Sequence, residues 1–181
     1  YNVIGERIYN VPLTTGSLCL TLVYIVATIV GCVSGPAINR LGRMRTLVIA
    51  IVLMIVGFAG SAIFIKSGFG VLTFLACLFI AGVTAVYTPI YDAASDVLPV
   101  EENGRGVGIL DLMMNTSASI GVAVYSSLMA SDTMGKGGLF GVGSGVEAQT
   151  SIMFWIMCTV SVLSMIVLFV FRKSFTAKRY V

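Results

Sequence analysis

The sequence contains no histidine, and only 10% of its 181 residues carry a charged side chain. Histidine is the usual acid–base group near neutral pH and the commonest metal ligand. The cysteines stand too far apart to form a C-x-x-C metal or redox pair; they are Cys19, Cys32, Cys77 and Cys158. We therefore expect no metal, no disulfide framework, no cofactor and no enzyme activity, since no nucleophile lies beside an activating base.

Hydrophobic residues make up 57% of the chain, and its mean hydropathy is +1.01. Soluble domains carry about 25% charged residues, so this composition excludes a soluble domain of similar size. One helical span needs ~20 apolar residues, and five spans with short loops use nearly the whole chain. The composition predicts an all-α integral membrane protein of the lipid bilayer, with no nucleic-acid partner.

Apolar runs between helix breakers predict five transmembrane helices in one helical domain. They cover residues 13–36, 46–65, 70–97, 106–130 and 151–171, and residues 172–181 form a tail. The glycine-rich stretch 135–145 matches no nucleotide-binding fingerprint, and we expect it to be a flexible loop without a ligand.

Basic residues are divided unequally between the two sides of the predicted membrane. The loops 39–45 and 99–105 and the tail share one side and hold eight of the eleven Lys and Arg residues, as three, one and four. Cytoplasmic loops carry an excess of Lys and Arg. We therefore expect the eight-residue side, with the C-terminus, to be cytoplasmic.

A tight basic turn is predicted between the first two spans. Its candidate functional residues are Gly35, Asn39, Arg40, Gly42, Arg43 and Arg45. In one interpretation the turn fastens two helix ends together. In the other it is a topological anchor, whose arginines reach lipid phosphates.

The spacing of this turn resembles the Gly-x-x-x-Asp-Arg-x-Gly-Arg-Arg signature of the major facilitator superfamily, in the weaker copy of the second half. Asn39 stands where that signature has Asp, which removes a carboxylate that could pair with arginine. A second segment, 102–123, resembles the penultimate span of fourteen-span drug:proton antiporters such as tetracycline and multidrug exporters. It has a glycine-rich start, a polar residue about one turn inside and a later Gly-x-Ala.

The resemblance implies that these spans are the last five of six helices in a C-terminal bundle, completed by an N-terminal half. It implies secondary active transport in a bacterial plasma membrane, with proton-coupled export of amphipathic small molecules by alternating access. Two alternatives stay open. One is a solute:proton symporter of the same superfamily, and the other is a structural membrane subunit that moves no solute.

Three carboxylates are predicted at one depth of the membrane. Asp92 and Asp96 are four residues apart near the end of the third span, and Asp111 lies inside the fourth, with Asn115 four residues further. Each intramembrane carboxylate costs roughly 2.5–3.5 kcal/mol at a helix centre, so each asks for a reason. In one interpretation they exchange protons or contact substrate in a wet vestibule. In the other, Asp96 simply reaches the interface, and Asp92 or Asp111 pairs with Arg40, Arg43 or Arg105 to fasten neighbouring helix ends.

The predicted orientation can be tested by cysteine labelling of the full-length protein in a background without native cysteines. We expect Arg43→Cys and Lys178→Cys to resist a membrane-impermeant maleimide applied from outside, and Lys136→Cys to react, because basic loops stay in the cytoplasm. Labelling of position 43 or 178 from outside would reverse the orientation.

Overall fold

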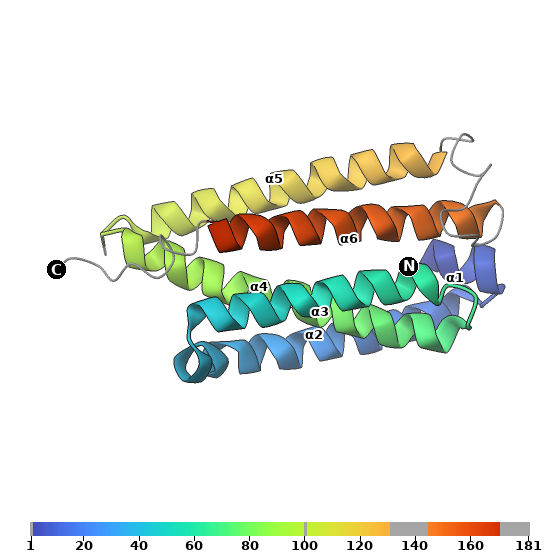
Figure 1. The fold of residues 1–181 in the computed structure, drawn as a ribbon, viewed down its shortest axis with the longest axis horizontal. Helices are drawn as coiled ribbons and strands as arrows, with labels where there is room; N and C mark the ends of the chain where they lie inside the picture. The colour runs from blue at the N-terminus through green and yellow to red at the C-terminus, as the bar shows by residue number, and fades with distance from the viewer. Residues whose placement is uncertain (1, 100, 131–144, 171–181) are drawn as a thin grey trace.

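The computed structural model describes residues 2–99, 101–130 and 145–170, which form helices without any strand (Figure 1). The helices are α1 (Asn2–Tyr9), α2 (Leu13–Leu41), α3 (Arg43–Ile63), α4 (Phe69–Val97), α5 (Asn103–Ala130) and α6 (Val146–Val170). The predicted tail 172–181 and nearly all of the predicted loop 135–145 lie outside the described residues.

Five helices of the described chain, α2 to α6, are long and apolar enough to cross a membrane. A helix satisfies every backbone hydrogen bond within itself, as the dry interior of a bilayer requires. The all-α fold with five candidate spans is thus confirmed. The sequence did not predict α1, which at eight residues is too short to span.

Several helix bounds differ from the predicted spans; α3, for example, covers Arg43–Ile63 instead of 46–65. α2 continues through Pro36 to Leu41 instead of ending at the proline, while α5 begins at Asn103 and α6 at Val146, before their apolar runs. Proline removes one backbone donor but does not force a helix to stop. Hydropathy marks the apolar centre of a helix, whereas its ends are set by backbone geometry.

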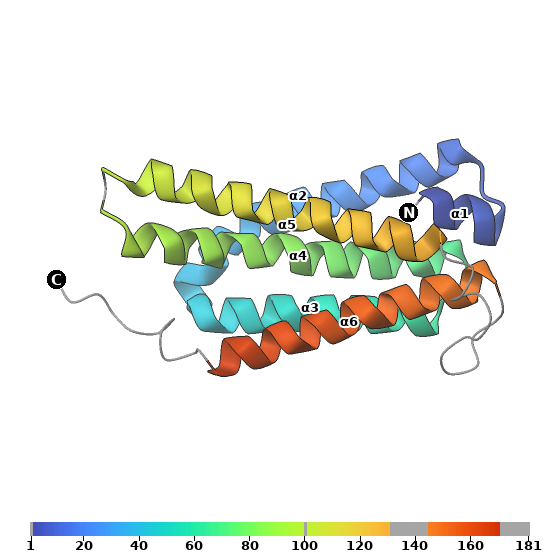
Figure 2. The ribbon, with the colours of Figure 1, turned by 90° about the horizontal axis from the view of Figure 1, so that it is seen from above.

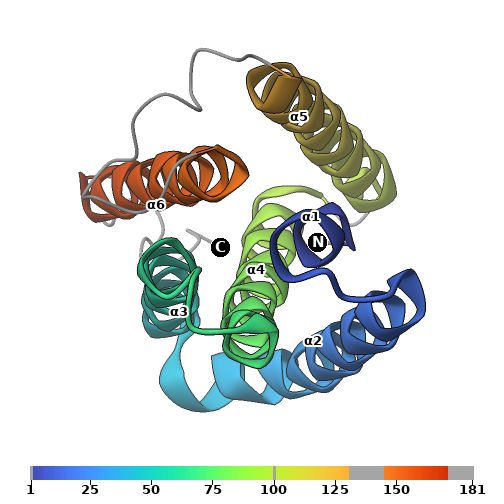
Figure 3. The same cartoon turned by 90° about the vertical axis from the view of Figure 1, so that its right-hand side faces the viewer.

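The long helices run roughly along one axis, with the α2–α3 and α4–α5 turns at one end and α1 at the other (Figures 1 and 2). We call the end with the two turns the basic end, because it carries Arg40, Arg43, Arg45 and Arg105. Viewed along the axis, α4 lies between α2 and α3, and α6 lies beside α3 (Figure 3). α5 has only limited contact with α4 and α6 and lies apart from the other long helices.

Glycines bring α3 and α4 close together. A Cβ built on Gly57 would lie 2.6 Å from the Cβ of Phe79, and one built on Gly82 would lie 2.7 Å from the carbonyl oxygen of Ala50. Small residues at helix crossings let backbones approach and gain dispersion contacts, which replace the hydrophobic effect as a driving force in lipid. In α5, a Cβ built on Gly106 would overlap the Leu98 side chain, whereas Gly104 and Gly108 face open space.

The core at the basic end joins α3 to α6. Leu47 and Ile51 of α3 and Leu168 of α6 are buried together, with partly buried neighbours from α4 such as Ile90 packed against them. The three helices α3, α4 and α6 therefore share one apolar core in this half of the bundle.

Polar contacts fasten the opposite end. The Tyr9 hydroxyl donates to the carbonyl of Ile65, and burial raises the pKa of Tyr9, so the phenol keeps its proton; the nearby Glu147 carboxylate adds to this shift. Ser151 Oγ donates to the carbonyl of Ala62 over 2.9 Å, in a buried contact from α6 to α3. These bonds tie α1 and α6 to the end of α3.

We expect Gly82→Ala to destabilise the protein by about 1–3 kcal/mol, because the new methyl group meets backbone atoms of α3 that cannot move aside. Gly121→Ala is the matched control, since a Cβ there meets nothing within 4 Å, and alanine favours a helix by up to about 1 kcal/mol. Thermal unfolding of the full-length protein in detergent, followed by circular dichroism, measures both. Equal melting temperatures would contradict the close packing.

Candidate functional site

One residue, Gly42, separates α2 from α3 at the basic end. Its backbone has φ 85° and ψ 151°, a conformation almost confined to glycine. Its N–H donates to the carbonyl of Ile38 over 2.8 Å, and its own carbonyl accepts from Thr46. The predicted seven-residue turn is thus reduced to one residue, so the ends of α2 and α3 have a fixed geometry.

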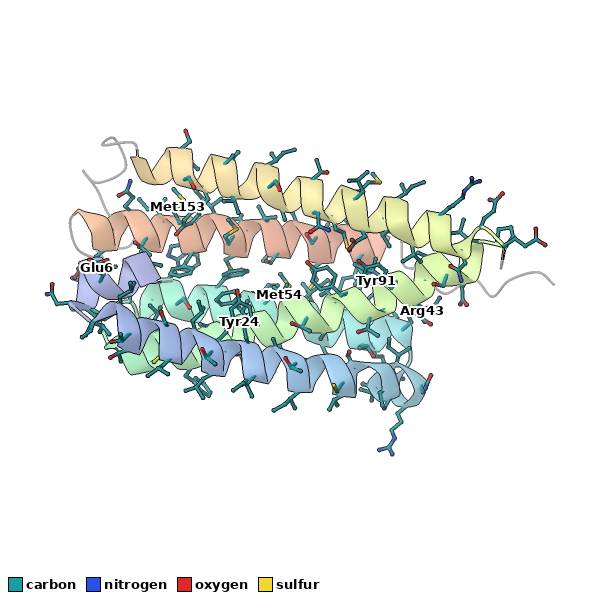
Figure 4. All side chains as sticks on the ribbon, turned by 180° about the vertical axis from the view of Figure 1, so that it is seen from behind. Glu6, Tyr24, Arg43, Met54, Tyr91 and Met153 are labelled. Atoms are coloured by element: carbon teal, nitrogen blue, oxygen red, sulfur yellow. The ribbon has the colours of Figure 1, made fainter. Side chains whose placement is uncertain are left out.

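Arg43, which directly follows that glycine and is labelled in Figure 4, binds two carboxylates of α4. Its Nε and Nη2 donate to Asp92 Oδ2 over 2.8 and 2.6 Å, and Nη2 also donates to Asp96 Oδ2 over 2.6 Å. Asp92 and Asp96 are four residues apart, so they share one face of α4. We call these three residues the Arg43 cluster.

The Arg43 cluster is only partly shielded from solvent. The exposed fraction is 24% for the Arg43 side chain, 44% for Asp92 and 57% for Asp96. Screening therefore limits each pair to about 1 kcal/mol or less. The cluster ties the start of α3 to the end of α4. Because it holds one more carboxylate than arginine, its net charge is negative.

The side chains of the superfamily-like turn have different surroundings. Arg43 turns inward to α4, whereas Asn39, Arg40 and Arg45 are exposed. No carboxylate at position 39 is required for an arginine pair, because α4 supplies two. Gly35 has no atom within 4 Å of its added Cβ and makes no close helix contact there.

Asp111 of α5 has a different partner, Tyr91 of α4. The Tyr91 hydroxyl donates to Asp111 Oδ1 over 2.7 Å, and the ring of Tyr91 stacks on Tyr87 with centroids 6.3 Å apart. Asn115 donates from Nδ2 to the backbone carbonyl of Asp111 over 2.9 Å. Figure 4 labels Tyr91 on α4, which lies further from the basic end than Arg43 does.

The face of α5 around Asp111 is exposed. Asp111, Asn115 and Ser119 recur every four residues, and all three are exposed, as is most of the described part of α5. A stripe that contains a carboxylate gains nothing by facing lipid. It therefore needs water or further protein against it.

Arg43 is one of the arginines that the sequence offered as a partner for Asp92, whereas the partner of Asp111 was not predicted. Asp92 and Asp96 meet in the Arg43 cluster, while Asp111 bonds Tyr91, the residue before Asp92, and no ion pair to Arg105 is present in the described chain. Tyr91 was missed as a site residue. The sequence did contain a sign of its role, because Tyr91 carries a hydroxyl and directly precedes Asp92, a predicted intramembrane carboxylate.

A cavity of about 400 Å³ opens between α3, α4 and α6, with Met54, Ile90 and Val160 among its walls. Its two hydroxyls, Ser161 and Ser164, donate to carbonyls of their own helix. The cavity therefore offers an apolar ligand no directed polar contact. The described residues also contain no cluster of three or more possible metal ligands among His, Cys, Asp and Glu.

We expect Arg43→Gln to lower the free energy of unfolding by about 1–2 kcal/mol, because two carboxylates lose their common partner and repel each other. Arg105→Gln is the control, since Arg105 is an exposed arginine at the same end. The double variant Arg43→Gln/Asp92→Asn should lose less than the sum of the two single changes. Strict additivity in thermal unfolding would show that the contact contributes nothing.

The Major Facilitator Superfamily profile matches residues 4–180, almost the whole chain. No curated protein and no solved structure matches the sequence significantly. The five candidate spans and the basic turn are in accord with the profile match. The chain belongs to the Major Facilitator Superfamily of membrane transporters.

Proposed function

We propose that the chain is the C-terminal helical part of a proton-coupled secondary transporter, which exports amphipathic small molecules by alternating access with an N-terminal half. The observation that carries this proposal is the Tyr91–Asp111 hydrogen bond on the exposed face of α5. It combines a titratable group, a hydroxyl and an open surface at membrane depth.

Asp111 is the group suited to exchange a proton. As a carboxylate it accepts the hydrogen bond of Tyr91, and as a carboxylic acid it would carry one proton and no charge. The change in charge alters the cost of placing α5 against an apolar surface, because burying a charge costs far more than burying a neutral acid. Protonation would thereby be coupled to the position of α5.

The two sides of the bundle would then have different roles. α3 and α4 are joined by glycine packing and by the Arg43 cluster, so they form a rigid unit. α5 has limited contact with α4 and α6, so it can change position at small cost. Alternating access needs such a rigid body with a responsive surface facing the other half.

The test is transport by the full-length protein in proteoliposomes under an imposed pH gradient, with ethidium as the amphipathic probe. We expect Asp111→Asn to abolish gradient-driven accumulation and to keep downhill exchange, because the amide keeps the shape but cannot ionise. Tyr91→Phe should reduce the rate several-fold without abolishing coupling, because it removes only the donor.

Glu101→Gln is the matched control, since Glu101 is an exposed carboxylate in the α4–α5 turn. It should accumulate ethidium like the wild type. Accumulation by Asp111→Asn against a gradient, with the pH dependence of the wild type, would remove Asp111 from the coupling mechanism. Gradient-driven movement in the opposite direction would favour the symporter.

A further inference from the structure

The α2–α3 turn carries a positive charge that the bundle does not neutralise. Its segment 39–45 contains three arginines and no carboxylate, because Asn39 stands at the acidic position of the superfamily signature. Arg43 binds two carboxylates of α4, so two of the positive charges of the turn, those of Arg40 and Arg45, are left without a carboxylate in contact among the described residues. Arg40 and Arg45 are exposed and form no ion pair with a residue that the structure describes.

An apolar groove of about 250 Å³ begins directly inside this turn, between α2, α3 and α4. Its walls include Ile29, Val33, Leu41, Thr46, Ile49 and Leu53. The hydroxyl of Thr46 bonds the carbonyl of Gly42, and the hydroxyl of Ser34, also in the wall, pairs with Thr88. The groove therefore has no free hydroxyl and suits a hydrocarbon chain.

The two exposed arginines extend from the same helix faces as the groove walls. On α2, Arg40 follows Val33 by seven residues, which is close to two full turns. On α3, Arg45 precedes Ile49 by four residues, which is about one turn. Arg40 and Arg45 therefore lie just beyond the groove walls, on the side of the α2–α3 turn.

We propose that this groove binds one anionic phospholipid, with an acyl chain between α2 and α3 and the phosphate between Arg40 and Arg45. Guanidinium groups recognise phosphate oxygens by bidentate hydrogen bonds, and the two arginines supply both geometry and charge. The exposed side chains of Val33 and Ile49, at 59% and 48%, give the acyl chain open access from the bilayer. The amide of Asn39 repels no anion, as a carboxylate there would.

The lipid would act on the same turn that positions the Arg43 cluster. Gly42 is the one residue between α2 and α3, so a headgroup held by Arg40 and Arg45 fixes the two helix ends relative to each other. Binding of this lipid requires neither proton coupling nor a particular direction of transport.

The experiment is thermal unfolding of the purified full-length protein in detergent, titrated with dioleoyl phosphatidylglycerol. A ligand that binds only the folded state raises the melting temperature with its concentration. We expect a saturable rise for the wild type and for Arg105→Gln, and a much weaker one for Arg40→Gln/Arg45→Gln. Loss of two arginines should raise the apparent Kd roughly thirtyfold, which corresponds to about 2 kcal/mol.

Val33→Trp tests the acyl chain separately, because it fills the groove and leaves both arginines in place. It should also weaken the rise. Three comparisons can overturn the proposal. The first is an equal rise in melting temperature with dioleoyl phosphatidylcholine. The second is an equal rise with soluble glycerol phosphate, which would indicate a phosphate site without lipid. The third is an equally weakened rise in Arg105→Gln, which would indicate unspecific attraction.

Discussion

The cost of charge in a membrane is the constraint on which the rest of this structure depends. Arg43 and two carboxylates of α4 satisfy one another at the end of the bundle, where solvent still reaches them. Their contact fixes the start of α3 against the end of α4. The single glycine between α2 and α3 places Arg43 at the first position of α3.

Packing inside the apolar region follows from the same constraint. Without a hydrophobic driving force in lipid, α3 and α4 associate through close backbone contact at Gly57 and Gly82. One polar contact adds to this, the 2.7 Å bond between the hydroxyls of Ser34 and Thr88, which joins α2 to α4. The result is a unit of α2, α3 and α4, to which α6 is attached through the shared apolar core.

α5 is not packed in this way, because it has only limited contact with α4 and α6. It carries Asp111 on an exposed face and has open space at Gly104 and Gly108, although glycines usually mark close packing. A hydrogen bond from the Tyr91 hydroxyl to Asp111 connects it to α4. A transporter of this superfamily needs both a stable scaffold and a surface that responds to its ligands.

The sequence by itself determined the number and type of the long elements, though not the short helix α1. Long apolar runs require helices in a bilayer, and a spacing of four places Asp92 and Asp96 on one face of α4, whatever surrounds it. The sequence could not determine which arginine meets them, because Arg40 of α2 and Arg43 and Arg45 of α3 have the same chemistry and differ only in the direction in which their helices present them. Only the tertiary structure decided that Arg43 points to α4 and that Tyr91, not an arginine, meets Asp111. Partners on different helices depend on the rotation and depth of each helix, which no local sequence pattern encodes.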